Sequence, residues 1–99
     1  MQKRTYFVIE HFRHGAAPVY ERFLCEGRMA PEGLGYLASW VDTTLERCYQ
    51  VMETAQPALL EEWMSRWRDL VEFEVHEVID SAEAARRALP QRGDSGGGE

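Results

Sequence analysis

Residues 36–53, YLASWVDTTLERCYQVME, contain two strand-like segments joined by a polar turn. The first segment runs from Tyr36 to Asp42 and the second from Arg47 to Glu53, and both are rich in aromatic and β-branched residues. The turn between them, Thr43 to Glu46, is longer than the shortest hairpin turns. This stretch therefore predicts an antiparallel hairpin in the middle of the chain.

A helix is predicted on each side of this hairpin. Pro18 is suited to a first helical position, and apolar residues follow it at the spacing of one helical face until about Gly27. Pro57 opens the second helix, and the apolar face of that helix holds Leu59, Leu60, Trp63, Met64 and Trp67. A tryptophan stripe at this spacing predicts packing against a sheet rather than a ligand cage.

The outer segments of the chain predict two more strands. Arg4 to Phe12 (RTYFVIEHF) is β-branched and aromatic, and Leu70 to Ile79 (LVEFEVHEVI) alternates between apolar and polar residues. Asp80 or Ser81 can cap a last short helix that ends at Pro90. We expect residues 90–99 to form a disordered tail.

The order β-α-β-β-α-β predicts an α+β protein with a ferredoxin-like fold in one domain, residues 1–89. Right-handed crossovers place both helices on one face of a four-stranded antiparallel sheet with the strand order 4-1-3-2. The helix side of this sheet is expected to take the apolar set Phe7, Ile9, Leu37, Val41, Tyr49, Val51, Phe73 and Val75.

The opposite, open face of the sheet is expected to carry a mixed set of residues: Val8, Glu10, Tyr36, Ala38, Trp40, Cys48, Gln50, Met52, Glu72, Glu74 and His76. Its apolar members form a patch too large to leave in water, so we expect a second subunit or a ligand to cover it. We predict a homodimer through this face. A small molecule would bind between the facing sheets, in a cavity lined by Glu10, Trp40, Gln50, Met52, Glu74 and His76.

Three of these residues are candidates for catalysis, namely Glu10, Glu74 and His76. If the two carboxyls share a partly dry site, one pKa should rise towards neutrality, as general acid–base chemistry requires. Another interpretation pairs both carboxyls with arginines such as Arg13, Arg28 or Arg47 across the dimer interface. In a third interpretation the interface is filled and holds no cavity.

Two other groups give weaker signals. His11 and His14 flank Arg13 at the end of the first strand, where a cluster can hold an anion, but their spacing is not diagnostic of a metal site. Cys25 and Cys48 lie on different predicted elements without CxxC spacing. A buried cysteine is usually inert, so neither thiol is predicted to be a nucleophile.

Composition excludes some partners. The chain of 99 residues has a formal net charge of −6, whereas nucleic acids and anionic membranes attract basic surfaces. Neither is expected as a partner. The sequence shows no signal peptide and no apolar run long enough to span a bilayer, which predicts a cytoplasmic protein. No motif calls for a cofactor.

Several short motifs resemble a known family: Tyr20–Phe23, Gly27–Met29, Pro31–Leu34, Ser39–Val41, Arg47–Glu53 and Trp67–Glu74. Over about residues 6–85 the chain is similar to the domain-of-unknown-function family DUF3303. The resemblance implies a short bacterial protein related to the dimeric α/β-barrel group, in which two ferredoxin-like sheets face each other. That group includes cofactor-free monooxygenases, lactone isomerases, haem enzymes and many binding proteins, and fold alone does not choose among them.

No catalytic pattern of those relatives can be carried over to residues of this chain. Our leading expectation is therefore a homodimeric small-molecule-binding or accessory protein. The alternative is a small cofactor-free enzyme of the isomerase or monooxygenase type, with a carboxylate as general base.

Overall fold

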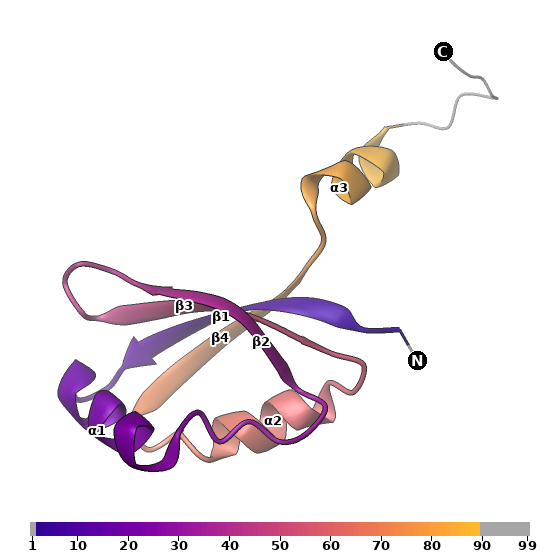
Figure 1. The fold of residues 1–99 in the computed structure, drawn as a ribbon. Coiled ribbons are helices and arrows are strands. Elements are labelled where there is room, and N and C mark those ends of the chain that lie inside the picture. The colour runs from indigo at the N-terminus through magenta and orange to yellow at the C-terminus, as the bar shows by residue number, and fades with distance from the viewer. Residues whose placement is uncertain (1, 90–99) are drawn as a thin grey trace.

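The computed structural model describes residues 2–89, and Figure 1 shows their arrangement. The elements follow the order predicted from the sequence: β1 (Arg4–Phe12), α1 (Ala16–Glu26), β2 (Gly35–Val41), β3 (Arg47–Thr54), α2 (Ala58–Ser65), β4 (Val71–Val78) and α3 (Ser81–Ala88). The tail predicted for residues 90–99 lies outside the described residues.

The four strands form one antiparallel sheet with the order β2-β3-β1-β4. This confirms the predicted 4-1-3-2 order and the ferredoxin-like α+β class. The turn that joins β2 to β3 is fixed by Asp42, whose carboxylate accepts hydrogen bonds from the backbone N–H groups of Glu46 and Arg47. In Figure 1, α1 and α2 both lie beneath the same face of the sheet, and no helix of residues 2–89 lies over the other face.

The hydrophobic core lies between this sheet face and the two helices. Trp63 and Met64 of α2 and Trp67 just after it are buried, together with Met52 of β3 and Val71 at the start of β4. The prediction that the tryptophan stripe packs against the sheet is therefore confirmed. Burial of such large side chains is the main source of stability for so short a chain.

The expected assignment of residues to the two sheet faces is wrong for the central strands. Tyr6, Val8 and Glu10 of β1 are buried beneath the helices, whereas Phe7 and Ile9 lie on the open face. In β3 the helix side takes Cys48, Gln50, Met52 and Thr54, and the open face takes Tyr49 and Val51. A bulge between Tyr36 and Ala38 shifts the register of β2 and leaves Leu37 exposed.

The faces of β4 are as predicted, because this strand alternates between clearly apolar and clearly polar residues. Phe73 packs against Trp63 with ring centroids 5.4 Å apart, and Val75 also contacts the core. Glu72, Glu74 and His76 point to the open face, as expected.

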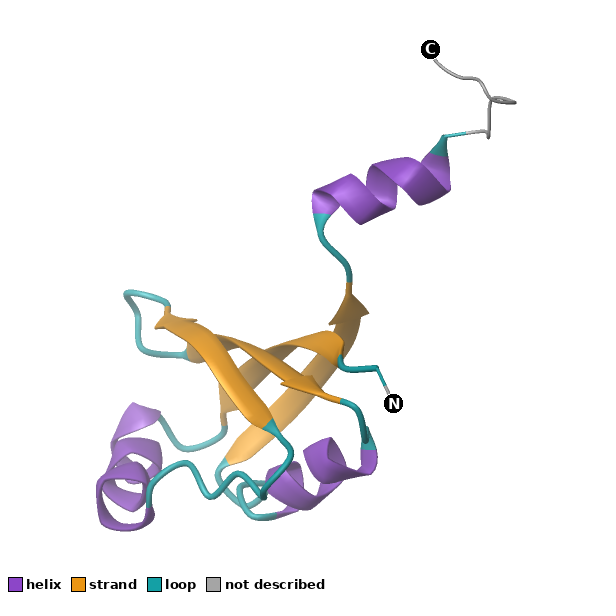
Figure 2. Cartoon of the chain, turned by 45° about the vertical axis from the view of Figure 1, so that its right-hand side comes forward, coloured by secondary structure: helices purple, strands orange, loops and turns teal. Residues whose placement is uncertain are grey.

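The last helix, α3, extends away from the rest of the molecule (Figure 2) and has no buried residue. Asp80 is its N-cap, and its side chain accepts a hydrogen bond of 2.8 Å from the backbone N–H of Glu83, as predicted. No helix among residues 2–89 is long and apolar enough to cross a membrane.

Candidate functional site

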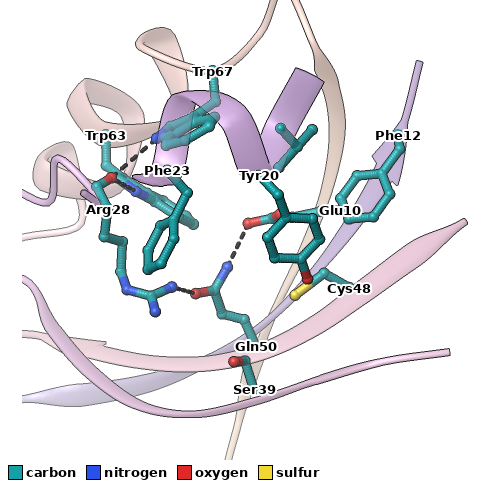
Figure 3. Close-up of a pocket in the computed structure, with 11 residues that line it drawn as sticks. Glu10, Phe12, Tyr20, Phe23, Arg28, Ser39, Cys48, Gln50, Trp63 and Trp67 are labelled. Atoms are coloured by element: carbon teal, nitrogen blue, oxygen red, sulfur yellow. Dashed lines mark hydrogen bonds between the residues drawn. The ribbon is translucent and has the colours of Figure 1, made fainter. Parts of the chain in front are cut away.

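A cavity of about 200 Å³ lies between the sheet and the helices, on the covered face of the sheet (Figure 3). Its walls come from β1, α1, β2, β3, α2, the loop after α1 and the segment after α2. Five aromatic side chains form most of the apolar wall: Phe12, Tyr20, Phe23, Trp63 and Trp67. Aromatic walls with a few polar groups are typical of small-molecule sites.

The polar part of the cavity is a chain of three side chains, Glu10, Gln50 and Arg28. The amide N–H of Gln50 donates a hydrogen bond to Oε2 of Glu10, and the amide oxygen of Gln50 accepts one from Arg28 (Figure 3). Gln50 is 1% exposed and Glu10 is 8% exposed. The amide thus links a buried carboxyl to the guanidinium of Arg28, which is partly buried.

Burial dominates the acid–base behaviour of Glu10. Desolvation raises the pKa of this carboxyl from its ordinary value of 4.5 to about 7, although the charge of Arg28 and the hydrogen bond from Gln50 both lower it. Glu10 therefore exchanges its proton near neutral pH. A carboxyl with this pKa can hold a polar ligand in either protonation state, or move a proton.

Arg28 is held in place at two points, its guanidinium and its backbone carbonyl. Its guanidinium carbon lies 3.8 Å from the ring centroid of Tyr36 and 5.3 Å from that of Phe23. Its backbone carbonyl accepts two hydrogen bonds of 3.0 Å, one from the indole N–H of Trp63 and one from that of Trp67. The aromatic faces stabilise the cation, and the two indoles fix the loop that carries it.

The same loop uses unusual backbone conformations at two positions after Arg28, Met29 and Gly33. Met29 has a φ of 61° and its carbonyl accepts a hydrogen bond of 2.6 Å from Arg66. Gly33 has a φ of +97°, and a Cβ built there would lie 2.9 Å from Cδ1 of Leu59. The loop therefore depends on a residue without a side chain at this position.

Cys48 and Tyr20 complete the inner wall of the cavity. Burial, followed by the negative charge of Glu10, raises the pKa of the Cys48 thiol to about 12. The pKa of Tyr20 is also raised, by burial first and then by Cys48 and Glu10. Both groups stay neutral at physiological pH, which agrees with the expectation that Cys48 is not a nucleophile.

The structure divides the predicted site residues between the two faces of the sheet. Only Glu10 and Gln50 line the cavity beneath the helices. Met52 is fully buried in the core, and Trp40, Glu74 and His76 lie on the open face. The prediction that these residues share one cavity between two sheets is therefore wrong.

The expected coupling of Glu10 with Glu74 is wrong for the same reason. In the pairing of β1 with β4, Glu74 lies opposite Ile9 and Glu10 lies opposite Phe73, so the two carboxyls point to opposite faces. The pKa of Glu10 rises through burial and not through a second carboxylate. The arginine linked to Glu10 is Arg28 of the same chain.

Glu74 instead forms a small ionic cluster on the open face. Its carboxylate lies 2.7 Å from Nε2 of His76 and 3.4 Å from Nε2 of His11. These contacts, the His76 hydrogen bond first, lower the pKa of Glu74.

Of the other residues considered as an anion site, His14 is exposed and Arg13 donates to the backbone carbonyl of Arg68 at 2.9 Å. Within residues 2–89 no three His, Cys, Asp or Glu side chains group as metal ligands.

The open face also carries a partly exposed apolar stripe, formed by Phe7, Ile9, Trp40, Tyr49 and Val51. The rings of Phe7 and Tyr49 stack with centroids 6.2 Å apart, and Trp40 is 59% exposed. We call this set the open-face stripe.

Sequence reasoning missed most of the cavity. The sequence predicts Arg28 only as a partner across an interface, and it assigns Phe12, Tyr20, Phe23 and Ser39 to no site. One signal was present in the sequence: two tryptophans four residues apart, Trp63 and Trp67, bring two indole N–H donors to one helix face, and buried donors need acceptors. The acceptor here is the backbone of the loop that carries Arg28.

The chain has a two-layer α+β fold, with an aromatic cavity between the sheet and the helices. Folds of this class serve many functions. The chain matches the family described as "Domain of unknown function (DUF3303)" over residues 4–91, and it belongs to that family. No curated protein matches the chain, and no solved structure does.

Proposed function

We propose that this chain is a homodimeric small-molecule-binding protein whose ligand occupies the cavity between the sheet and the helices. The observation that carries the proposal is the buried Glu10 carboxyl, which faces a cavity of about 200 Å³ with aromatic walls. An apolar protein cavity of about 150 Å³ holds one benzene ring. A single-ring or short-chain molecule therefore fits this site.

The polar groups of the cavity support a ligand site rather than a simple packing defect. A buried carboxyl costs folding free energy when its desolvation outweighs its partners, and the raised pKa of Glu10 indicates that cost. A core residue of the same shape without the charge would be more stable here. Such local costs are expected where a side chain serves function.

The proposed dimer rests on the open-face stripe defined above. Phe7, Ile9, Tyr49 and Val51 are only partly covered within one chain, and Trp40 is largely exposed. A second copy can bury the stripe by apposing its own open face, since a two-fold interface brings the same patch together from both subunits. A chain of 99 residues also gains stability from such burial.

A second candidate function is proton-transfer catalysis, favoured by the pKa of Glu10 near 7. In this alternative Glu10 is the general base of a small cofactor-free enzyme, for example of the isomerase type. Arg28, linked to it through Gln50, would stabilise negative charge that develops on the substrate. The contacts around Glu74 and His76 do not enter this mechanism, because both residues lie on the other face of the sheet.

Native mass spectrometry on protein purified without a denaturing step tests the leading proposal. We expect a dimer that carries an additional small mass. A Ser39→Phe variant fills the cavity and should lose that mass, whereas Thr43→Phe, in the exposed turn, should keep it. Retention of the mass by Ser39→Phe would place the ligand elsewhere and contradict the proposal.

Once the retained molecule is identified, Glu10→Gln separates binding from catalysis. A binding protein changes its affinity but turns over nothing in either form. An enzyme with Glu10 as base loses turnover in the variant while it still binds the molecule, and the wild-type rate rises with pH through an apparent pKa near 7.

A further inference from the structure

We infer that the cavity selects neutral single-ring molecules that carry a hydroxyl group, with phenol as the simplest probe. This inference rests on the proposed binding function and names the chemistry of its ligand. It is drawn from three observations: the shape and walls of the cavity, the acceptor that Glu10 offers, and the balance of charge between Glu10 and Arg28 (Figure 3).

The walls favour an aromatic ring. Phe12, Tyr20, Phe23, Trp63 and Trp67 surround the space, and aromatic side chains form favourable edge-to-face and offset contacts with a bound ring. Phe12 and Tyr20 already meet edge to face, with ring centroids 6.4 Å apart. At about 200 Å³ the cavity exceeds what one benzene ring needs and leaves room for a substituent.

Glu10 offers the acceptor for that substituent. Among the described residues its one hydrogen-bonding partner is Gln50, which donates to Oε2, so Oε1 remains as an acceptor at the cavity wall. Gln50 is engaged at both ends, because its amide nitrogen donates to Glu10 and its amide oxygen accepts from Arg28. A ligand hydroxyl can donate to Oε1, and a hydrogen bond to a carboxylate is stronger than one between neutral groups.

The balance of charge argues against an ionised ligand. When Glu10 is ionised, its charge and that of Arg28 cancel across Gln50, and the guanidinium is stabilised further by the rings of Tyr36 and Phe23. An anion would approach the Glu10 carboxylate, and a cation would approach Arg28. In a largely dry site an uncompensated charge is costly, whereas a neutral hydroxyl donor adds none.

Selection by a carboxylate also couples binding to pH. A hydroxyl that donates to Oε1 favours the ionised form of Glu10, so phenol should bind more tightly as the pH rises through the titration of this carboxyl. Phenol itself stays neutral well above that range, because a phenolic group ionises near pH 10. Toluene, in which a methyl group replaces the hydroxyl, should show no such dependence.

The test measures dissociation constants of phenol, toluene, benzoate and benzylamine by NMR titration at about pH 5.5 and pH 8.5, on either side of the Glu10 pKa. In the wild-type chain at the higher pH we expect phenol to bind about tenfold more tightly than toluene, the usual gain from a hydrogen bond to a charged group. We expect this preference to shrink at the lower pH.

Glu10→Gln should bind toluene as the wild type does and lose both the preference for phenol and its pH dependence. Glu74→Gln is the matched control, because Glu74 lies on the open face, and it should leave every affinity unchanged. If Glu10→Gln does not fold, the pH dependence of the phenol preference in the wild-type chain decides the matter alone.

The outcomes separate this inference from the proposed function. Tighter binding of benzoate or benzylamine than of phenol overturns the selection for neutral ligands and leaves the binding function intact. The same holds if no probe binds but native mass spectrometry detects a retained molecule that Ser39→Phe loses. If no probe binds and no mass is retained, both the inference and the proposed function fail.

Discussion

Glu10 and Glu74 lie on opposite faces of one sheet, although neighbouring strands carry them. Their environments separate their acid–base behaviour. Burial raises the pKa of Glu10 to about 7, whereas hydrogen bonds from His76 and His11 lower the pKa of the exposed Glu74. Two carboxyls of the same chemistry thus differ through their surroundings: Glu10 is buried at a cavity wall, and Glu74 is exposed and contacts two histidines.

The raised pKa of Glu10 makes the stability of the protein depend on pH. Between about pH 4.5 and 7 the unfolded chain releases this proton while the folded chain keeps it, so stability falls as the pH rises through that window. Below about pH 4.5 the protonated Glu10 makes its full contribution to the stability of the folded chain. The full shift corresponds to roughly 3 kcal/mol.

Glu10→Gln removes this dependence. The wild type loses about 3 kcal/mol of unfolding free energy between pH 4 and pH 8 through this group, and the variant does not. Relative to the wild type, the variant should therefore be about 3 kcal/mol more stable at pH 8 than it is at pH 4. Urea unfolding at several pH values measures it. Carboxyls with lowered pKa values, such as Asp69 at about 2, act below this window and are common to both proteins. A pH-independent difference would show that Glu10 is solvated.

Trp63 and Trp67 should act together on Arg28. Each indole donates to the same backbone carbonyl, so either single change to Phe leaves one donor in place. The double variant leaves the carbonyl without an indole partner. We therefore expect the double variant to lose about 1 kcal/mol more stability than the two single variants lose together. A double-mutant cycle from urea unfolding measures this coupling, and strictly additive effects would contradict it.

The open-face stripe should decide the oligomeric state. Tyr49→Lys places a charge in the middle of the stripe, beside Phe7, and should convert a dimer into a monomer. Leu24→Lys is the control, because it places the same charge on an apolar residue of α1 that is 82% exposed. Light scattering coupled to size exclusion measures the mass. A monomeric wild type, or a Tyr49→Lys dimer, would contradict the proposed interface.

Two glycines allow the loop before β2 to be tested. Gly33→Ala meets both a positive φ and the side chain of Leu59, whereas Gly27→Ala meets a positive φ with no atom nearby. Gly27 has a φ of 73° and a ψ of −164°, a conformation that is essentially restricted to glycine, so we expect Gly27→Ala to cost about 1–3 kcal/mol. We expect Gly33→Ala to carry an additional cost, set by how far the side chain of Leu59 can move. Equal losses of stability, measured by thermal unfolding, would show that the close approach to Leu59 is unimportant.

The order of elements and the strand order could be predicted because each depends on local patterns and handedness. The faces of β1 and β3 could not. In both strands the residues that face the helices include Glu10, Gln50 and Thr54, whereas the open face holds Phe7 and Val51. A rule that buries the more apolar face of each strand therefore chooses the wrong face. Because side chains alternate along a strand, shifting the assignment by one residue moves every side chain to the other face.

This failure has a physical cause. Polar side chains line the cavity on the covered face, whereas the apolar open-face stripe is only partly covered by the described chain. Local rules of burial are expected to fail where a site or an interface imposes its own requirements. β4 contributes no residue to the cavity or to the open-face stripe, and its faces follow the simple alternation of Val71, Glu72, Phe73 and Glu74.

The most direct test of the account is an NMR titration of the carboxyl carbon of Glu10, identified by its disappearance in Glu10→Gln. Glu74 serves as an internal comparison, because its pKa is lowered. We predict a midpoint near pH 7 for Glu10 in the free protein. A midpoint near the ordinary value of 4.5 would show that water reaches this carboxyl freely, and would contradict a dry, ligand-sized cavity with Glu10 in its wall.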